Sequence, residues 1–133
     1  MKALLKNIRI SPDKANLVAG LVRGAMVNDA LTQLKFTPKK GAKILYRVID
    51  SAASNAEHNL KQNREKLYVK EIIVSKGVTY KRGVSVSRGR VHPILKRTSQ
   101  ICVTVDVSTG TQAKKRVSKK KPAQSVTPSN TQD

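Results

Sequence analysis

Apolar residues at the start of the chain follow a strand pattern and then a helical one. Residues 4–10 predict a short strand with Ile8 and Ile10 on one face. A Ser-Pro-Asp sequence at 11–13 then supplies a hydroxyl N-cap, a proline at the first helical position and an acid in the first turn. The helix that begins there is predicted to end before Gly24, and its apolar positions are Leu17, Val18, Leu21 and Val22.

Two further helices are predicted before residue 61. Asn28 and Asp29 are typical N-cap residues and predict a short second helix, whose apolar positions are Leu31 and Leu34. Thr37 and Pro38 repeat the hydroxyl-then-proline start signal, and a longer helix is predicted after them. Its stripe of apolar residues at three- and four-residue spacing comprises Leu45, Val48, Ile49, Ala52, Ala53, Ala56 and Leu60. The alanines in this stripe would allow close approach to a sheet or another helix.

After the long helix, the spacing of apolar residues changes from 3.6 to two. A first alternating run consists of Leu67, Val69 and Ile73, and a second of Ile101, Val103, Val105 and Val107. Two strands with such faces can pair and pack on the long helix. Residues 76–97 between them keep strand-forming residues but have no apolar face. We therefore predict a β-hairpin whose arms project from the body by roughly 30 Å, about ten residues per arm.

Charge distinguishes this hairpin from the rest of the chain. The 133 residues include 27 Lys plus Arg and 8 Asp plus Glu, for a formal net charge of +19. No acid lies between Glu71 and Asp106. The cations of that stretch are Lys76, Lys81, Arg82, Arg88, Arg90, Lys96 and Arg97. Crowding cations on a thin protrusion is unfavourable unless phosphates neutralise them, so a nucleic-acid partner is predicted, with a solvated basic loop as the simpler alternative.

Other basic residues give weaker indications. Lys39 and Lys40 lie in the predicted first turn of the long helix, where the helix dipole disfavours cations unless an anion binds there too. Residues 109–133 are basic and poor in apolar residues, and we predict that they form a disordered tail. The predicted organisation is therefore one folded domain over residues 1–108, including the hairpin, followed by this tail.

Several classes of protein are excluded or disfavoured. No segment has the ~20 consecutive apolar residues of a transmembrane helix, and Lys6 interrupts the N-terminal apolar residues too early for a secretory signal. The single cysteine, Cys102, excludes an intramolecular disulfide and a multi-cysteine zinc site. These features fit a cytoplasmic protein.

The polar residues contain no catalytic or metal-binding pattern. His58 and His92 lack ligand-spaced partners, and an ion pair between Arg47 and Asp50, three residues apart, is the simplest reading of that helix face. The one Phe and three Tyr are too scattered for a base-stacking platform. No catalytic residue, metal site or cofactor is predicted.

Several motifs resemble those of one protein family, in order and at the expected separations. They are Arg9-Ile10-Ser11-Pro12-Asp13-Lys14, Leu17-Val18-Ala19-Gly20-Leu21-Val22-Arg23-Gly24, Ser51-Ala52-Ala53-Ser54-Asn55-Ala56-Glu57-His58-Asn59, Lys81-Arg82, Arg88-Gly89-Arg90 and Ile94-Leu95-Lys96-Arg97-Thr98-Ser99. Over residues 5–107 the chain resembles the universal large-subunit ribosomal protein twenty-two family, in its bacterial or organellar form.

The resemblance implies an α+β fold, with three helices on a small three-stranded antiparallel sheet and a long protruding β-hairpin. It implies a non-enzymatic structural constituent of the large ribosomal subunit that binds ribosomal RNA, assists subunit assembly and lines the nascent-peptide exit tunnel with its hairpin. The implied partners are large-subunit ribosomal RNA, neighbouring ribosomal proteins and the nascent polypeptide, with no membrane and no homo-oligomer.

Some RNA-facing residues can be carried over from the family to matching positions here. The matching body positions are Arg9, Lys14, Arg23, Asn55, His58 and Asn59, and the matching hairpin cations are Lys81, Arg82, Arg88 and Arg90. The expected tunnel tip consists of Gly83, Val84, Ser85, Val86 and Ser87. At this tip the family often has Pro-Arg-Ala, whereas this chain has Ser-Val-Ser and so lacks one cation.

Two other functions compete with this one. A free-standing basic nucleic-acid chaperone or DNA-binding protein would share the charge, and an enzyme would have to use Glu57 and His58. The long acid-free hairpin favours the ribosomal interpretation, because a rigid protrusion is of little use to a chaperone and suits a protein embedded in RNA.

Overall fold

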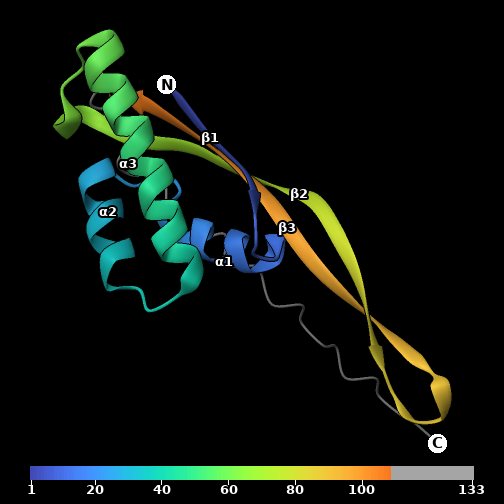
Figure 1. Ribbon diagram of the computed structural model, residues 1–133. Coiled ribbons are helices and arrows are strands. Elements are labelled where there is room, and N and C mark those ends of the chain that lie inside the picture. The colour runs from blue at the N-terminus through green and yellow to red at the C-terminus, as the bar shows by residue number, and fades with distance from the viewer. Residues whose placement is uncertain (109–133) are drawn as a thin grey trace, which may run out of the picture.

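Three helices pack against one face of a three-stranded antiparallel sheet with strand order β1-β3-β2 (Figure 1). The computed structural model describes residues 1–108, so the predicted tail over 109–133 lies outside the described residues. The elements are β1 (Lys2–Ile8), α1 (Pro12–Val22), α2 (Val27–Phe36), α3 (Lys40–Leu60), the 3-10 turn η1 (Arg64–Lys66), β2 (Leu67–Ser85), the 3-10 turn η2 (Ser87–Gly89) and β3 (Val91–Val107). The predicted α+β class is confirmed.

The core lies between α3 and the sheet. The apolar stripe predicted on α3 is buried from Leu45 to Ala56, while Leu60 at its end is 52% exposed. The stripe packs with β3, whose buried apolar residues are Ile101, Val103 and Val105. Burying each large side chain of this kind contributes about 1.5–3 kcal/mol, and the alanines of α3 let the helix approach its neighbours closely.

The inward face of β2 differs from the predicted alternation. Ile73 was expected inside but is 49% exposed, whereas its neighbour Ile72 is 2% exposed. The pairing of β2 with β3 shifts register between Val69 and Glu71. Lys70 is thus an extra residue that reverses which side chains point inward, which is the effect of a β-bulge. The prediction for Ile73 is wrong for this reason.

The predicted apolar face of α1 is correct in only two of its four positions. Leu17 is 74% exposed and Leu21 46% exposed, whereas Val18 and Val22 are buried. The buried stripe of this helix is completed by smaller residues, Pro12, Ala15 and Ala19. A short helix that packs through alanines buries a narrow face and leaves the adjacent leucines outside.

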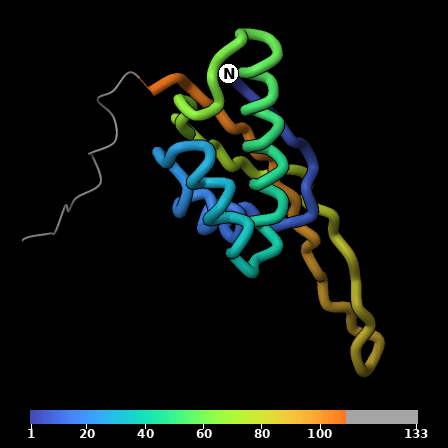
Figure 2. Tube along the Cα trace, turned by 90° about the vertical axis from the view of Figure 1, so that its left-hand side faces the viewer, coloured from blue at the N-terminus to red at the C-terminus, as the bar shows by residue number. Residues whose placement is uncertain are grey.

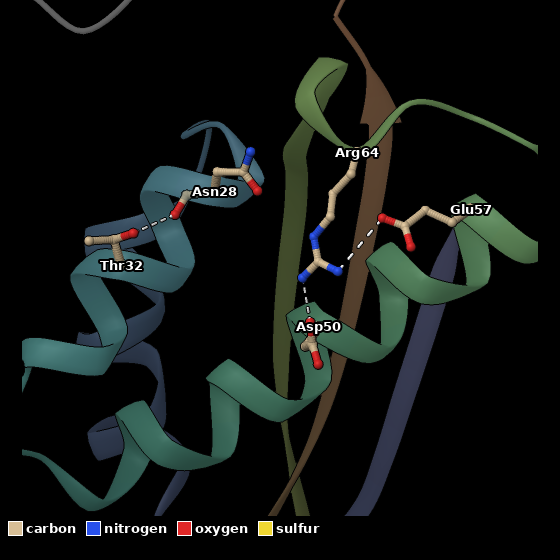
Figure 3. Close-up of polar contacts among 5 residues, drawn as sticks. All are labelled: Asn28, Thr32, Asp50, Glu57 and Arg64. Atoms are coloured by element: carbon tan, nitrogen blue, oxygen red, sulfur yellow. Dashed lines mark hydrogen bonds and ion pairs between the residues drawn. The ribbon is translucent and has the colours of Figure 1, made fainter.

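Helix α2 begins at least two residues earlier than its sequence indicated. Its first residue is Val27 and its N-cap is Met26, rather than the predicted Asn28–Asp29. Asn28 lies inside the helix, where its carbonyl accepts a hydrogen bond of 2.9 Å from the hydroxyl of Thr32 (Figure 3). A bridge between Met26 and Tyr68 of β2 ties the preceding segment to the sheet, which sets where the helix starts.

An ion pair across the end of α3 replaces the predicted Arg47–Asp50 pair, which is not formed in residues 1–108. Asp50 instead accepts a 2.5 Å bond from Arg64 of η1, and the same guanidinium lies 3.6 Å from Glu57 (Figure 3). Because Arg64 comes after the helix, this contact fastens the connection between α3 and β2, which local helical spacing could not reveal.

The predicted hairpin is confirmed. Strands β2 and β3 pair from Leu67–Val107 to Ser85–Val91, and their distal halves extend well away from the body (Figures 1 and 2). Every residue from 78 to 97 is exposed. The turn spans residues 86–90, where the amide of Val86 donates to the carbonyl of Arg90. Three of the expected tip residues, Gly83, Val84 and Ser85, therefore belong to the strand rather than to the turn.

Candidate nucleic-acid interface

A hollow of about 1050 Å³ lies where the hairpin leaves the body. It is lined by the β1–α1 connection, the start of α1, the first residue of α3 and the proximal arms of β2 and β3. Six of its lining residues are cations, namely Arg9, Lys14, Lys40, Arg82, Lys96 and Arg97. We call this feature the basal hollow. The sequence predicted each of these six as a nucleic-acid contact, but not that they converge.

The body side of the basal hollow is held together by close packing of α1 and α3. Gly41, the second residue of α3, is buried, and a Cβ there would lie 3.4 Å from the side chains of Ile10 and Val18. Such a distance is ordinary van der Waals contact, so the start of α3 packs directly on α1 and the segment before it. Lys14 of α1 and Lys40 of α3 are thereby brought to one hollow.

The hairpin side is organised by the register of the two strands. Tyr80 of β2 lies directly opposite Lys96 of β3, and Arg82 follows two residues along β2. The guanidinium carbon of Arg82 lies 5.9 Å from the centre of the Tyr80 ring, within the range of a cation–π contact. Below them, the hydroxyl of Thr98 donates a 2.6 Å bond to the carbonyl of Val78. The wall of the hollow is therefore built from ordered, mutually contacting groups.

The basal hollow is electrostatically uncompensated. No acid lines it, and within residues 1–108 none of its six cations takes part in an ion pair. The ion pairs of the described residues involve Arg64 and Lys70, at the other end of the sheet. Converging cations without counter-charges suit a phosphate-rich ligand, since guanidinium groups match phosphate oxygens in a bidentate geometry.

Comparison with known proteins gives this surface a context. The family model for ribosomal protein L22p/L17e matches residues 3–106. The large ribosomal subunit protein uL22 of Protochlamydia amoebophila is 51% identical over 104 residues, which cover 78% of this chain and 94% of that relative. The uL22 protein of Finegoldia magna is 47% identical over 105 residues, covering 79% and 94%. That of Herpetosiphon aurantiacus is 50% identical over 105 residues, covering 79% and 93%.

The chain belongs to the ribosomal protein L22 family. The resemblance found in the sequence is thus confirmed, and the family consists of structural proteins rather than enzymes. The family match ends at residue 106, so the whole of the predicted tail over 109–133 lies beyond it.

The residues considered for an enzyme have other surroundings. Glu57 pairs with Arg64, and His58 is its immediate neighbour on α3, so the two side chains point in different directions around the helix. Residues 1–108 contain no cluster of three or more side chains suited to hold a metal ion. Among the helices that the structure describes, none is long and apolar enough to cross a membrane.

A second set of predicted L22-family contacts lies apart from the basal hollow. Asn55, His58 and Asn59 are near the end of α3, whereas Lys40 is at its start. At 1.5 Å per residue, the 18 residues between Lys40 and His58 place them about 27 Å apart. The side-chain amide of Asn55 donates a 3.5 Å bond to the carbonyl of Lys2. The structure therefore gives two separate polar regions along α3 rather than one.

Arg23 makes bonds within the protein. Its guanidinium donates to the carbonyl of Ile72 at 2.9 and 3.2 Å and to the side chain of Asn16 at 2.5 Å. This arginine joins the end of α1 to β2, a role that sequence position alone did not indicate.

The remaining predicted residues are exposed but do not line the basal hollow. Lys39 is the N-cap of α3, and the others lie along the hairpin, namely Lys76, Lys81, Arg88 and Arg90. Sequence reasoning missed the five uncharged lining residues, which are Ile10, Ser11, Tyr80, Leu95 and Thr98. The one available signal was that Tyr80 directly precedes the Lys81–Arg82 pair.

Proposed function

We propose that this L22-family chain is a structural constituent of the large ribosomal subunit that binds ribosomal RNA and assists its assembly. The observation that carries the proposal is the convergence of six cations on an acid-free hollow at the foot of an exposed hairpin. Recognition rests on RNA shape and phosphate position rather than on base sequence. The named relatives, all large ribosomal subunit proteins of bacteria, support a place on the bacterial ribosome in the cytoplasm.

The hairpin has a separate part in the proposed function. It threads between RNA elements and reaches the nascent-peptide exit tunnel, where the turn over residues 86–90 meets the nascent polypeptide. Its exposed residues 78–97 support this, because a two-stranded ribbon is marginally stable in water and needs surrounding contacts. Arg88 and Arg90 carry the cations of the turn. Neighbouring ribosomal proteins complete the surroundings of the chain, which acts as a single copy.

The proposal is tested by co-sedimentation with large subunits at high salt, using the full chain and two double variants. Arg82→Ala with Arg90→Ala removes one cation from the basal hollow and one from the hairpin turn. We expect weaker binding to large-subunit RNA and a slope of log affinity against log salt that is shallower by about 1–2 units. Lys35→Ala with Lys66→Ala, two exposed cations outside both features, is the matched control and should change the slope less.

Two results would contradict the proposal. Failure of the native chain to co-sediment with large subunits would favour the free nucleic-acid chaperone. An identical salt slope in both double variants would show that the basal hollow and hairpin do not contact phosphates.

A further inference from the structure

The basal hollow has a mixed lining, which a purely phosphate-binding surface would not need. Besides its six cations, its lining includes two aliphatic residues, Ile10 and Leu95, and the aromatic residue Tyr80. The outside of a regular RNA helix presents phosphates and 2′-hydroxyl groups, and offers no unstacked base to such apolar groups. An unpaired nucleotide presents a charged phosphate and a flat apolar base together. We propose that the basal hollow binds unpaired, bulged RNA, with one base stacked on the ring of Tyr80.

Tyr80 is placed for this role by its neighbours. It is 43% exposed, so a base can reach it, and the Arg82 guanidinium lies 5.9 Å from its ring centre. Lys96 stands opposite it on β3. An aromatic ring flanked by two cations can hold a base by stacking while the cations hold the phosphates on either side.

The floor of the basal hollow is buried and hydrogen-bonded within the protein. Ile10 is 8% exposed and Thr98 2% exposed, and the Thr98 hydroxyl is bonded to the Val78 carbonyl at 2.6 Å. This floor therefore requires little reordering on binding, whereas the wall formed by the exposed hairpin is the part that RNA would order. The volume of about 1050 Å³ slightly exceeds the usual range for small-ligand sites, about 300–1,000 Å³, so the hollow accommodates more than one nucleotide.

This inference rests on the proposed function and narrows it, because it specifies non-helical RNA and names the residue that distinguishes such RNA from a duplex. The sequence argued against a base-stacking platform because its aromatics are scattered. A single aromatic ring inside a cationic hollow can stack on one base without an extended aromatic platform.

The test uses the full chain and two RNA hairpins with the same stem, one fully paired and one with a three-nucleotide bulge that carries 2-aminopurine. Binding is followed by fluorescence anisotropy at one fixed salt concentration, and stacking by quenching of the 2-aminopurine. We expect the bulged RNA to bind about tenfold more tightly than the paired RNA, with quenching on binding. Tyr80→Leu should remove both the preference and the quenching, whereas Tyr80→Phe should keep both.

Phe36→Leu, which removes an exposed aromatic ring at the end of α2, outside both the basal hollow and the hairpin, is the control and should behave as the native chain. Equal affinity for the two RNAs, or a bulge preference that survives Tyr80→Leu, would overturn this inference while leaving RNA binding by the chain intact. Absence of binding to either RNA would instead overturn the proposed function as well.

Discussion

Ser99 is buried in the middle of the sheet, paired in register with Ile8 of β1 and Lys76 of β2. Its hydroxyl has no hydrogen-bond partner among the described residues. A buried polar group without a partner costs about 1–3 kcal/mol. Ser99→Ala should therefore raise the free energy of unfolding, by about 1 kcal/mol, as measured by urea denaturation. The neighbouring Thr98→Ala is the contrasting variant and should lower it, because it removes the bond to Val78. A lower unfolding midpoint for Ser99→Ala would contradict the argument.

The Lys70 ammonium gives a residue-scale prediction about pH. It lies 2.8 Å from Asp106 Oδ2, and this hydrogen bond, with one from the Val107 amide, lowers the pKa of Asp106 below its ordinary value of 3.8. The same contact raises the pKa of Lys70 above 10.5. The pair therefore contributes to the stability of the folded chain at pH values above the unfolded-state pKa of the carboxyl. Its contribution is lost as pH falls through the lowered value, and again as pH rises through that of Lys70.

Lys70→Met should move the pKa of Asp106 back toward its ordinary value, as followed by NMR of the carboxyl carbon. Lys76→Met, on the same strand and outside this pair, is the control and should leave the lowered pKa of Asp106 unchanged. Both groups of the pair are well exposed, so solvent screens them, and the variant should change the pKa much more than the stability. An Asp106 pKa that is insensitive to Lys70→Met would show that the contact does not persist in solution.

At the scale of elements, Gly77 marks the point where the hairpin leaves the body. The β2–β3 register shifts between Lys76 and Thr79, and a Cβ on Gly77 would lie 2.5 Å from the hydroxyl oxygen of Thr98. Gly77→Ala should therefore displace Thr98 and reduce stability by about 1–3 kcal/mol, the usual cost of overpacking. The combination with Thr98→Ala removes the clashing oxygen. We expect the double variant to be more stable than the sum of the single effects predicts, as tested by a denaturation double-mutant cycle. Strict additivity would contradict the packing argument.

Element-scale features also show what the sequence could and could not predict. The long helix and the β3 face were predictable because each is a periodic run of apolar residues, and the hairpin because strand-forming residues continue there without an apolar face. Which residues of β2 face the core could not be predicted, because the bulge at Lys70 depends on pairing with β3 rather than on local sequence. The internal hydrogen bonds of Arg23 could not be predicted for the same reason, because its partner Ile72 is 49 residues away in the sequence. The cations of the basal hollow were predictable from charge and motif, but their convergence depends on the tertiary packing of α1, α3 and the hairpin, which local sequence does not reveal.

At the scale of the whole molecule, the described residues divide into an end of the body that holds the ion pairs and a hairpin end whose cations lack acidic partners there. The ion pairs of residues 1–108 lie where β2 begins and β3 ends, next to the closing turn η1. The basal hollow and the hairpin turn carry cations without acidic partners in this part of the chain. Such a distribution leaves the body able to fold by burying its own core, and makes the hairpin depend on an external polyanion for charge neutralisation.

This division predicts different local stabilities in the isolated chain. Within the body, amides of β3 such as those of Ile101 and Val103 lie in a central strand with buried side chains. Along residues 78–97, the β2–β3 ladder continues, but every side chain is exposed and no third strand or helix covers it. Opening free energies fall toward zero where few apolar contacts support the backbone bonds. Native-state hydrogen exchange should therefore show slow exchange at 101–105 and fast exchange at 78–97. Addition of large-subunit RNA should slow the second region selectively. Equal protection of both regions without RNA would show that the hairpin is stable by itself, and would remove the physical reason for its dependence on a partner.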